Sequence, residues 1–404
     1  MLVNADRLMS DLRELATIGK FQTGVHRPAF SDADLAAREW LRAKMTAAGL
    51  DASIDACGNV YGRMASADKA VLVGSHSDTV PYGGWLDGSL GVVYGLEIAR
   101  CFSESGAARV GVDAISFQDE EGTFLSLFGS RAFCGEDVAR EVAAAKDKDG
   151  TMLQSAMDRT PLGGRAASRL DPGRHVAFFE AHIEQGPRLE AGGQAIGIVS
   201  AIVGIRTFRL LFSGQADHAG TTPMSMRRDA GAAALTFGAS ISDKLKAIAG
   251  ADTVWNIGSA AFKPGASNVV PSEAEIFFQA RDSSTAALEE IEKLVRTTAE
   301  NCAKNFKATV EITRILNTTP TQMSPPLAAL IGQAASDLGA TTLSMPSGAG
   351  HDAMVLARYI PAAMLFVPSI AGRSHHISED THEQDIIVGA QVLLRAVELA
   401  ALAS

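Results

Sequence analysis

The spacing of apolar and polar residues predicts helices and strands that alternate along the first part of the chain. Apolar residues recur at helical spacing between Asn4, which can cap a helix, and Gly19, which can end it. A second helix is expected at 31–49. Two buried strands are expected at 71–74 and 110–117, with a third helix between them at 91–101. Strands that alternate with helices predict an α/β sheet with both faces covered.

The pattern changes near residue 204. Residues 206–212 alternate like a strand with one face in water. Two long helices are expected after it, at 229–248 and 285–304, and two further strands at 274–280 and 309–314. After Pro320 the first pattern returns. We therefore expect an α/β catalytic domain, with a mixed and mostly parallel sheet, formed by 1–203 and 320–404, and a smaller α+β domain inserted at 204–319.

Length and charge narrow the class of protein. A chain of 404 residues exceeds what one hydrophobic core usually supports, which agrees with two domains. Its 36 basic and 46 acidic residues give a net charge of −10. A negative balance argues against broad binding to nucleic acid or to an anionic membrane, so we expect neither as a partner.

Cysteine usage and hydropathy bear on the compartment. The four cysteines form no Cys-x-x-Cys pair, which favours reduced thiols in a cytosol over a disulfide framework. Charged residues interrupt the first 19 positions, so no signal peptide is expected there. No uncharged apolar stretch reaches the roughly 18 residues of a membrane span. These features predict a cytoplasmic protein without a membrane segment.

Two glycine-rich segments carry candidate metal ligands. The first, 74–81, follows a buried strand and contains His76 and Asp78, which would face the crevice at the strand's carboxyl end. A histidine followed by a carboxylate two positions later suits a metal ligand whose tautomer is fixed by a partner. The second segment, 83–91, surrounds Asp87 with glycines that permit sharp turns, and this lone carboxylate could bridge two ions.

Three adjacent carboxylates, Asp119, Glu120 and Glu121, follow the strand at 110–117. Near a buried strand end they repel one another and lose hydration, a cost that cations would offset. Neighbouring glutamates can then divide the work, one binding a metal and the other moving protons.

Two later segments add histidines to this set. Residues 180–187 offer His182, Glu184 and Gln185, and residues 372–380 offer His375 and His376. Together the histidines and carboxylates suit Zn²⁺, Mn²⁺, Co²⁺ or Ni²⁺. The absence of cysteine among them fits a catalytic site better than a structural one.

Each of these pieces also has a simpler interpretation. A lone histidine or aspartate near a glycine is more often a turn or core residue. The acidic run at 119–121 could be a solvated turn, and the histidine pair at 375–376 a surface loop. All of these simpler interpretations must hold together for the site to vanish, and they leave the placement at strand ends unexplained.

At these residues the chain resembles the M20 metallopeptidase superfamily, and more closely its hydantoinase/carbamoylase branch. That branch contains N-carbamoyl-L-amino-acid hydrolases, bacterial-type β-ureidopropionases and allantoate amidohydrolases. The resemblance runs nearly end to end, through the five segments above and through 24–27, 55–62, 217–224, 228–230, 268–271, 281–282 and 347–353.

The resemblance implies a binuclear metal site. His76, Asp87 and His182 would surround one ion, and Asp87, Glu121 and His375 the other, with Asp87 bridging. Glu120 would be the general base that acts on a metal-activated water, with Asp78 as a further catalytic residue. A histidine at position 182, where peptidase branches usually place a carboxylate, resembles the carbamoylase branch.

The resemblance also implies that 204–319 is a lid and dimerisation domain. It would bring His218, Asn268 and Arg281 to the substrate, with His218 serving either its own site or that of the partner in a homodimer. An imidazole can stabilise charge on a hydrolysed carbonyl, and a guanidinium can bind a substrate carboxylate through two hydrogen bonds. Without the resemblance, a surface salt bridge would explain Arg281 equally well.

Further substrate contacts are expected from the first domain. Gln185, like Asn268, can recognise an amide or carboxylate by hydrogen bonds. Gly350 is expected to contact the substrate from the Gly-rich turn before His351 and Asp352, which we expect to support the site.

Three features depart from the family pattern. Phe124 stands where a polar or basic residue is expected, and Gln279 replaces a carboxylate common two residues before the arginine. His376-Ile377 stands where Asn-Pro is frequent. The metal ligands survive these departures, but the substrate pocket is expected to be atypical.

The leading hypothesis is an amidohydrolase with two divalent ions that cleaves the carbamoyl C–N bond of a small anionic substrate, an N-carbamoyl-L-amino acid or related ureido or N-acyl acid. Alternatives are an allantoate amidohydrolase, or a peptidase or deacylase of the same superfamily. A non-catalytic metal-binding relative is a third hypothesis. Glu120 argues against it, because a binding protein has no use for a base beside the ligands.

Overall fold

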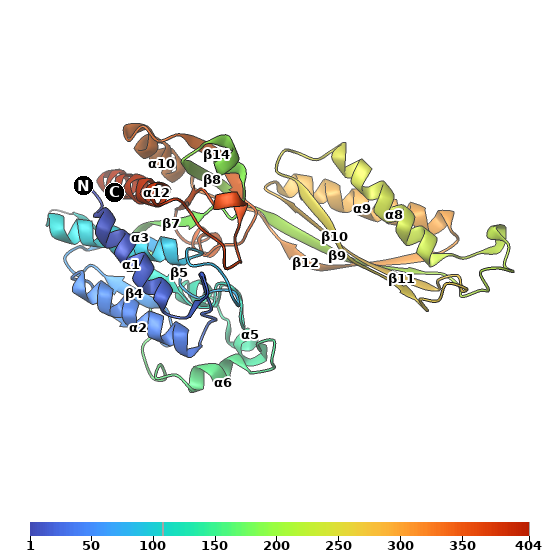
Figure 1. Cartoon of the computed structure of the whole chain (residues 1–404), viewed down its shortest axis with the longest axis horizontal. Coiled ribbons are helices and arrows are strands. Elements are labelled where there is room, and N and C mark those ends of the chain that lie inside the picture. The colour runs from blue at the N-terminus through green and yellow to red at the C-terminus, as the bar shows by residue number, and fades with distance from the viewer. Residues whose placement is uncertain (107–108, 404) are drawn as a thin grey trace. The chain divides into compact units, whose positions relative to one another are not determined.

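A computed structural model describes residues 1–106 and 109–403, which form two compact units (Figure 1). The first unit contains Met1–Ser200 and Met323–Ser404, and the second contains Ala201–Gln322. Each unit has its own buried apolar cluster.

A mixed sheet forms the centre of the first unit. Its strand order is β13 (Thr321–Gln322), β8 (Ile196–Ile202), β15 (Ala362–Val367), β7 (His175–Ile183), β5 (Lys69–His76), β6 (Val110–Phe117), β4 (Val60–Arg63) and β3 (Asp51–Ile54), and β14 (Thr342–Ser347) also pairs with β8. The pairs β15–β7, β7–β5 and β5–β6 are parallel. The pairs toward β8 and toward β4 are antiparallel. The expected fold class, α/β with a mixed sheet and covering helices, is confirmed.

The parallel strands bring distant segments to one edge of the sheet. In β5 and β6 the register pairs His76 with Phe117, the last residue of each strand. In β7 and β15 it pairs Ile183 with Val367, again at both strand ends. We call this side, where these four strands end, the carboxyl edge. Ligands of open α/β sheets bind at such an edge.

Helices pack around the sheet. The long ones are α1 (Ala5–Thr17), α2 (Asp32–Ala47), α3 (Ser89–Ser105), α10 (Pro325–Asp337) and α12 (Glu383–Ala403), and the short ones are α4 (Phe128–Phe133), α5 (Ala139–Ala144), α6 (Leu153–Asp158), α7 (Arg188–Gly192) and α11 (Ala353–Leu356). The side chain of Asn4 accepts a hydrogen bond from the Arg7 amide, and that of Ser31 accepts one from Asp34. The cap at Asn4 agrees with the sequence prediction.

One helix of the described chain, α12, is long and apolar enough by length and composition to cross a membrane. Half of its apolar window is buried, and Ile386, Leu393 and Val397 have no exposed surface. The helix packs against β7 and β15. Its hydropathy is therefore accounted for by its place in the core.

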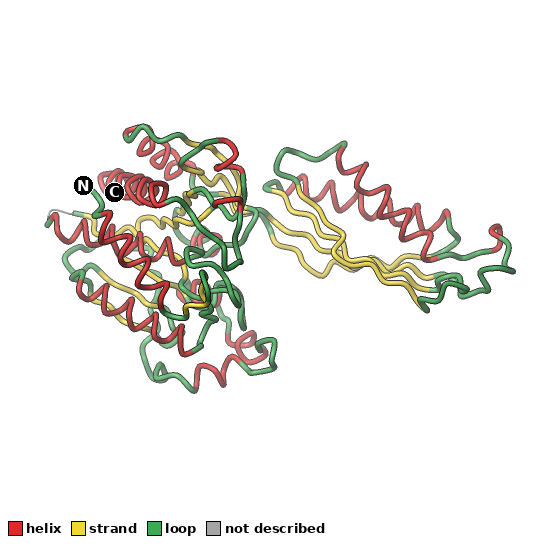
Figure 2. Tube along the Cα trace, viewed as in Figure 1, coloured by secondary structure: helices red, strands yellow, loops and turns green. Residues whose placement is uncertain are grey.

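The second unit is an antiparallel sheet with two helices packed on it (Figure 2). The strand order is β10 (Val254–Lys263), β11 (Glu273–Asp282), β9 (Gly204–Ser213) and β12 (Thr309–Thr318), and the helices are α8 (Ala230–Lys246) and α9 (Thr285–Asn305). Buried and half-buried positions alternate along β9 and β11, as expected for strands with one wet face. The sequence did not predict β10, because most of its residues are exposed and its apolar positions do not alternate.

Candidate metal centre

A cavity of about 170 Å³ lies at the carboxyl edge of the first unit. It is lined by Asp87, Glu120, Glu121, Ser126, His182, Gln185, Ala349, Gly350, His351 and His375. The lining comes from the end of β7 and from segments that follow β5, β6, β7, β14 and β15 in the chain, so the fold gathers residues far apart in the sequence.

His76, the last residue of β5, is fixed with one ring nitrogen toward the cavity side. Its Nδ1 lies 3.0 Å from the backbone carbonyl oxygen of Asp78, which leaves Nε2 free to bind a metal. A Cβ atom at Gly88 would lie 2.4 Å from the ring, and Gly88 has φ +64°. Only glycine fits that turn and lets the Asp87 loop approach the histidine.

The two carboxylate oxygens of Asp87 face different partners. Oδ1 lies 3.0 Å from His182 Nε2 and 3.7 Å from His76 Nε2. Oδ2 lies 3.3 Å from His375 Nε2, which in turn is 3.6 Å from Glu121 Oε1. The structure thus brings together two ligand groups, His76–Asp87–His182 and Asp87–Glu121–His375, that share Asp87.

The loop of Asp87 is held by hydrogen bonds to Glu379, a carboxylate that the sequence analysis did not single out. Glu379 Oε1 accepts hydrogen bonds from the Leu86 and Asp87 amides at 3.1 and 3.0 Å. Ser374 Oγ lies 2.9 Å from Asp87 Oδ2 and 3.0 Å from Glu379 Oε2. Any Cβ at Gly84 would lie 1.9 Å from Glu379 Oε1. The available signal was an acid four residues after His375.

The Asp78 carboxylate hydrogen-bonds to the backbone of the two glutamates and not to the His76 ring. Its carboxylate accepts hydrogen bonds from the Glu120 and Glu121 amides at 3.4 and 3.3 Å, whereas its Oδ1 is 3.8 Å from His76 Nδ1. The tautomer of His76 is therefore set by the Asp78 backbone, and not by the carboxylate that the sequence suggested. Buried Arg38, which sequence reasoning did not single out, lies 3.9 Å from Asp78 Oδ1.

Glu120 and Glu121 are carboxylates in a poorly solvated place. Burial raises the pKa of Glu120 well above its usual range, and the nearby Asp352 and Glu121 raise it further. Burial and the charge of Asp87 raise the pKa of Glu121 to about 9. Glu120 Oε2 is 3.5 Å from His76 Nε2. Asp119 is fully buried, so the acidic run is not a solvated turn.

At Asp87 and His182 the neighbouring charges shift the pKa toward the charged form, against the effect of burial. Burial alone would raise the pKa of Asp87, but His182, His375 and His76 hold it well below its usual range. Burial lowers the pKa of His182, but Asp87 outweighs this and raises it to about 9. Burial lowers the pKa of His76 to about 4, so this ring is neutral and able to bind a metal near pH 7.

The donor set fits divalent metal ions. Glu121 Oε1 is buried and has no hydrogen-bond partner among the described residues, which is costly for a carboxylate oxygen. A cation beside it would offset this cost and also that of its acidic neighbours. Imidazole and carboxylate ligands without cysteine suit the borderline and hard divalent ions.

Other predicted residues of the first unit lie around these groups. Gln185 Nε2 is 3.0 Å from Asp87 Oδ2, and Gly350 lines the cavity. The His351 ring packs edge-on against that of His182, with centroids 4.6 Å apart. His376 is exposed, and its Nδ1 lies 2.7 Å from Ser378 Oγ, so it belongs to neither ligand group.

His218, Asn268 and Arg281 belong to the second unit. His218 Nδ1 accepts hydrogen bonds from the Gly220 and Thr221 amides at 3.0 and 3.2 Å. The Ala219 amide donates to the Asn268 carbonyl at 2.9 Å, so His218 and Asn268 are close neighbours. Arg281, near the end of β11, donates from Nε to Gln279 Oε1 at 3.1 Å. Their approach to the cavity of the first unit stays a prediction.

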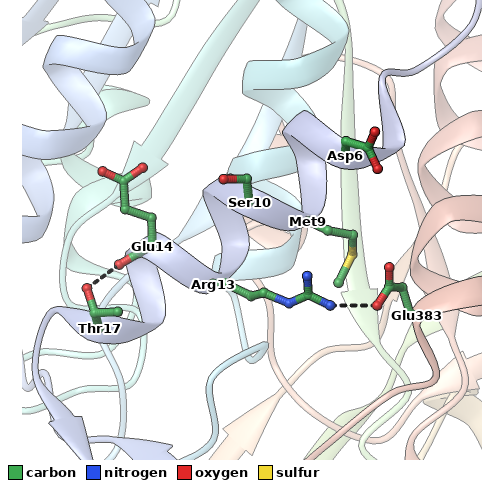
Figure 3. Close-up of a pocket in the computed structure, with 7 residues that line it drawn as sticks. All are labelled: Asp6, Met9, Ser10, Arg13, Glu14, Thr17 and Glu383. Atoms are coloured by element: carbon green, nitrogen blue, oxygen red, sulfur yellow. Dashed lines mark hydrogen bonds and ion pairs between the residues drawn. The ribbon is translucent and has the colours of Figure 1, made fainter.

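A hollow on α1 has a different character (Figure 3). It is lined by Asp6, Met9, Ser10, Arg13, Glu14, Thr17 and Glu383. Arg13 pairs with Glu383 at 2.6 Å, but the two side chains are 61% and 53% exposed. A surface ion pair of this kind contributes little, and these lining residues include no histidine or cysteine. We therefore assign no chemistry to it.

Comparison with known proteins gives the same picture as the geometry. The chain is 36% identical to an N-carbamoyl-L-amino-acid amidohydrolase from Paenarthrobacter aurescens, over 98% of this chain and 97% of that one. It is 32% identical to an allantoate amidohydrolase from Escherichia coli, over 92% and 91%. The crystal structure of an amidase of the hydantoinase/carbamoylase family from Burkholderia phymatum matches with a TM-score of 0.93 and 43% identity, over 100% and 99%.

A match to a family model covers most of the chain. The sequence model of peptidase family M20/M25/M40 matches residues 72–399, a range that contains both ligand groups and the second unit. The similar proteins are hydrolases, and the matching solved structure lies in the hydantoinase/carbamoylase branch. The chain is therefore a hydrolase of peptidase family M20/M25/M40, within its hydantoinase/carbamoylase branch.

Proposed function

We propose that this amidohydrolase uses two divalent metal ions to cleave the carbamoyl C–N bond of an N-carbamoyl-L-amino acid or a related ureido acid. The observation that carries the proposal is the pair of ligand groups that share Asp87, with Glu120 beside them. The names of the similar amidohydrolases support the choice of bond.

The proposed ligands are divided between two ions. His76, Asp87 and His182 would hold one, and Asp87, Glu121 and His375 would hold the other, with Zn²⁺, Mn²⁺, Co²⁺ or Ni²⁺ as suitable ions. When bound, such ions polarise the substrate carbonyl and make water a stronger nucleophile near pH 7.

Glu120 is the proposed general base. It lines the cavity without belonging to either ligand group, so its carboxylate is free to move protons. It takes one proton from the attacking water as the oxygen bonds to the carbamoyl carbon, and it returns that proton to the leaving nitrogen as the C–N bond breaks. The products are the free amino acid and carbamic acid, which decomposes to carbon dioxide and ammonia.

The remaining predicted residues would bind and orient the substrate. Gln185 and Gly350 are positioned to contact it from the cavity wall. Asn268 would add a hydrogen bond, His218 would stabilise the charge that develops on the carbonyl oxygen, and Arg281 would bind the α-carboxylate. These last three roles require the second unit, 204–319 in the sequence prediction, to act as a lid.

We also propose a cytoplasmic homodimer joined through the second unit. Large apolar side chains are exposed on its two outer strands: Val254 on β10 is 54% exposed, and Ile315 and Leu316 on β12 are 50% and 41% exposed. Exposed strand edges of this kind pair with other chains. If His218 serves the partner's site, mixing His218→Ala chains with Glu120→Gln chains should partly restore activity, because some heterodimers contain one complete site.

A substrate panel tests the proposed function. The metal-loaded protein is incubated with N-carbamoyl, N-formyl and N-acetyl amino acids, allantoate and dipeptides, and released ammonia and amino acid are measured. Preferred hydrolysis of N-carbamoyl amino acids supports the proposal. Preference for allantoate, which the similarity to an allantoate amidohydrolase makes the second candidate, or for dipeptides would replace it. No turnover of any member, with both metals bound, would indicate a non-catalytic relative.

A further inference from the structure

A second, larger cavity lies beside the metal groups in the first unit. Its volume is about 480 Å³, within the range of roughly 300–1,000 Å³ that is usual for ligand pockets. Glu121 lines both this cavity and the smaller one at the carboxyl edge. A substrate bound at the ligand groups would therefore have a neighbouring space for its side chain.

Aromatic residues form one wall of this cavity. Phe30 and Phe124 meet edge-on, with ring centroids 6.0 Å apart and planes at 73°. Tyr82 also lines the cavity and is 50% exposed. Edge-on and offset arrangements are the favoured geometries between aromatic rings, so this wall can receive another ring.

Strained backbone holds two of these rings in place. Phe30 and Tyr82 have φ values of +62° and +59°, a region that bulky residues rarely adopt. The Phe30 amide donates to Asp34 Oδ2 at 2.8 Å, and the Tyr82 ring stacks on His26 at 4.5 Å. Strain of this kind gathers at functional sites. The carboxyl edge with the two ligand groups, which we call the metal edge, shows it too, at Asp119, Gln185 and His375.

The two loops that build the wall are joined to each other. The Ala29 amide donates to Thr123 Oγ1 at 3.3 Å, which ties the loop of Phe30 to the loop of Phe124. The Phe30 ring also contacts that of buried Phe128, with centroids 6.4 Å apart. The rings are thus set before a ligand arrives.

Charged residues also line the cavity. Asp147, Lys148, Asp149 and Arg159 line it, and Asp147 Oδ1 already accepts hydrogen bonds from the Asp149 and Thr151 amides. Lys148 and Arg159 are exposed and free of carboxylate hydrogen bonds among those described. Cations are attracted to the face of an aromatic ring, whereas an aliphatic side chain gains nothing from them.

We propose that this cavity receives the side chain of the substrate and selects N-carbamoyl amino acids with an aromatic side chain. The inference rests on the proposed carbamoyl-hydrolase function and adds to it the class of substrate. Phe124 is its central specificity residue, because it lies three positions after Glu121 and packs edge-on against Phe30 in the wall.

The test compares N-carbamoyl-L-phenylalanine with N-carbamoylglycine, which has no side chain. For the metal-loaded protein we expect kcat/KM to favour the phenylalanine derivative at least about tenfold, since apolar pockets discriminate on this scale. Phe124→Ala should lower kcat/KM for the phenylalanine derivative about tenfold or more and leave the glycine derivative within about twofold. Tyr82→Ala should act in the same direction. Tyr359→Ala, an exposed tyrosine that does not line the cavity, is the matched control and should change neither value.

The outcomes separate this inference from the function on which it rests. Equal losses for both substrates in Phe124→Ala and Tyr82→Ala, or a wild-type preference for the glycine derivative, would overturn the inference and leave the carbamoyl-hydrolase proposal standing. Hydrolysis of neither substrate, with both metals bound and the fold intact by circular dichroism, would overturn the inference together with N-carbamoyl amino acids as the proposed substrates.

Discussion

Two buried clusters of carboxylate and histidine in the first unit differ in how well their charges are paired. One surrounds Asp113 on β6, whose Oδ1 accepts hydrogen bonds from Arg174 and the Met64 amide, each at 2.8 Å. Its Oδ2 accepts from Arg174 and Tyr61 at 2.8 and 2.6 Å and lies 3.2 Å from His175 Nε2. The other is the metal edge, where Glu121 Oε1 is buried without a hydrogen-bond partner among the described residues.

The pKa values express the same contrast. Burial would raise the pKa of Asp113, but Arg174, His175 and Tyr61 hold it at about 2. At Glu121 burial and Asp87 raise the pKa to about 9. The Asp113 cluster satisfies its own charge and is structural. At the metal edge the histidines offset the charge of Asp87, but Glu121 Oε1 has no hydrogen-bond partner among the described residues, which is the property of a site built for cations.

The largest effect is expected from Glu120→Gln. Losing a general base typically costs about 10²–10⁴-fold in rate, and the ligand groups remain complete, so turnover should collapse while metal content stays near that of the wild type. Glu121→Gln is the matched variant, and it should lose metal first. Turnover numbers and elemental analysis of both variants check this. Near-normal kcat in Glu120→Gln would show that our division of roles is wrong.

Breaking the other cluster should affect stability instead of chemistry. Asp113→Asn leaves Arg174, which is 5% exposed, without its counter-charge. Removing one member of a buried ion pair costs about 3–5 kcal/mol, and we expect a loss of that size in urea unfolding. The kcat of the molecules that remain folded should be unchanged. A stable Asp113→Asn variant with reduced kcat would contradict the contrast between the two clusters.

Sequence patterns were most informative where local and tertiary preferences agree. The caps at Asn4 and Ser31 and the strand 110–117 follow from residue type and periodicity, and the fold class follows from their alternation. β10 was missed because an edge strand with little burial leaves no periodic signal.

For the candidate site, the sequence predicted the ligand-type residues but not the residues that hold them in place. The ligand-type residues stand beside glycines at strand ends, which is visible in sequence. The parts played by Glu379, Ser374 and Arg38 depend on contacts between segments far apart in the chain, such as the 292 residues that separate Asp87 from Glu379. The Asp78 backbone, instead of its carboxylate, orients His76, and no residue pattern distinguishes these two arrangements.

Removing metal should make stability depend on pH at the metal edge. Glu121 and His182 both have pKa values near 9 in the metal-free fold, above ordinary values of 4.5 and 6.5. Between about pH 6.5 and 9 the folded state therefore holds protons that the unfolded state has lost, so stability falls as pH rises. Two protons held with pKa values near 9 correspond to roughly 4–5 kcal/mol between pH 7 and 9, and we expect chelated protein to lose stability of up to that size.

The metal-loaded protein provides the control for this experiment. Its unfolding free energy should change less over the same range, because cations replace those protons. Thermal or urea unfolding at several pH values, with and without chelator, measures the difference. Chelated protein that gains stability toward pH 9 would contradict the assigned directions.

The smallest effect is expected from Arg281→Lys in the second unit. Lysine keeps the charge but loses the planar fork that matches a carboxylate, so kcat/KM for an N-carbamoyl acid should fall about tenfold. The loss should shrink for the corresponding amide, which has no carboxylate. Arg209→Lys, whose partner on the sheet is Glu275, is the matched control. Equal losses for acid and amide would show that Arg281 supports structure.

The central claim is that two ions share Asp87, and metal stoichiometry tests it most directly. Metal-free wild-type protein and the Asp87→Ala variant are reconstituted with Mn²⁺ or Zn²⁺, freed of excess ion, checked for folding by circular dichroism, and assayed by elemental analysis. We predict close to two equivalents per chain for the wild type. Because both ligand groups contain Asp87, Asp87→Ala should retain well below one. A wild type that saturates at one ion, or an Asp87→Ala variant that keeps a full equivalent, would contradict the account.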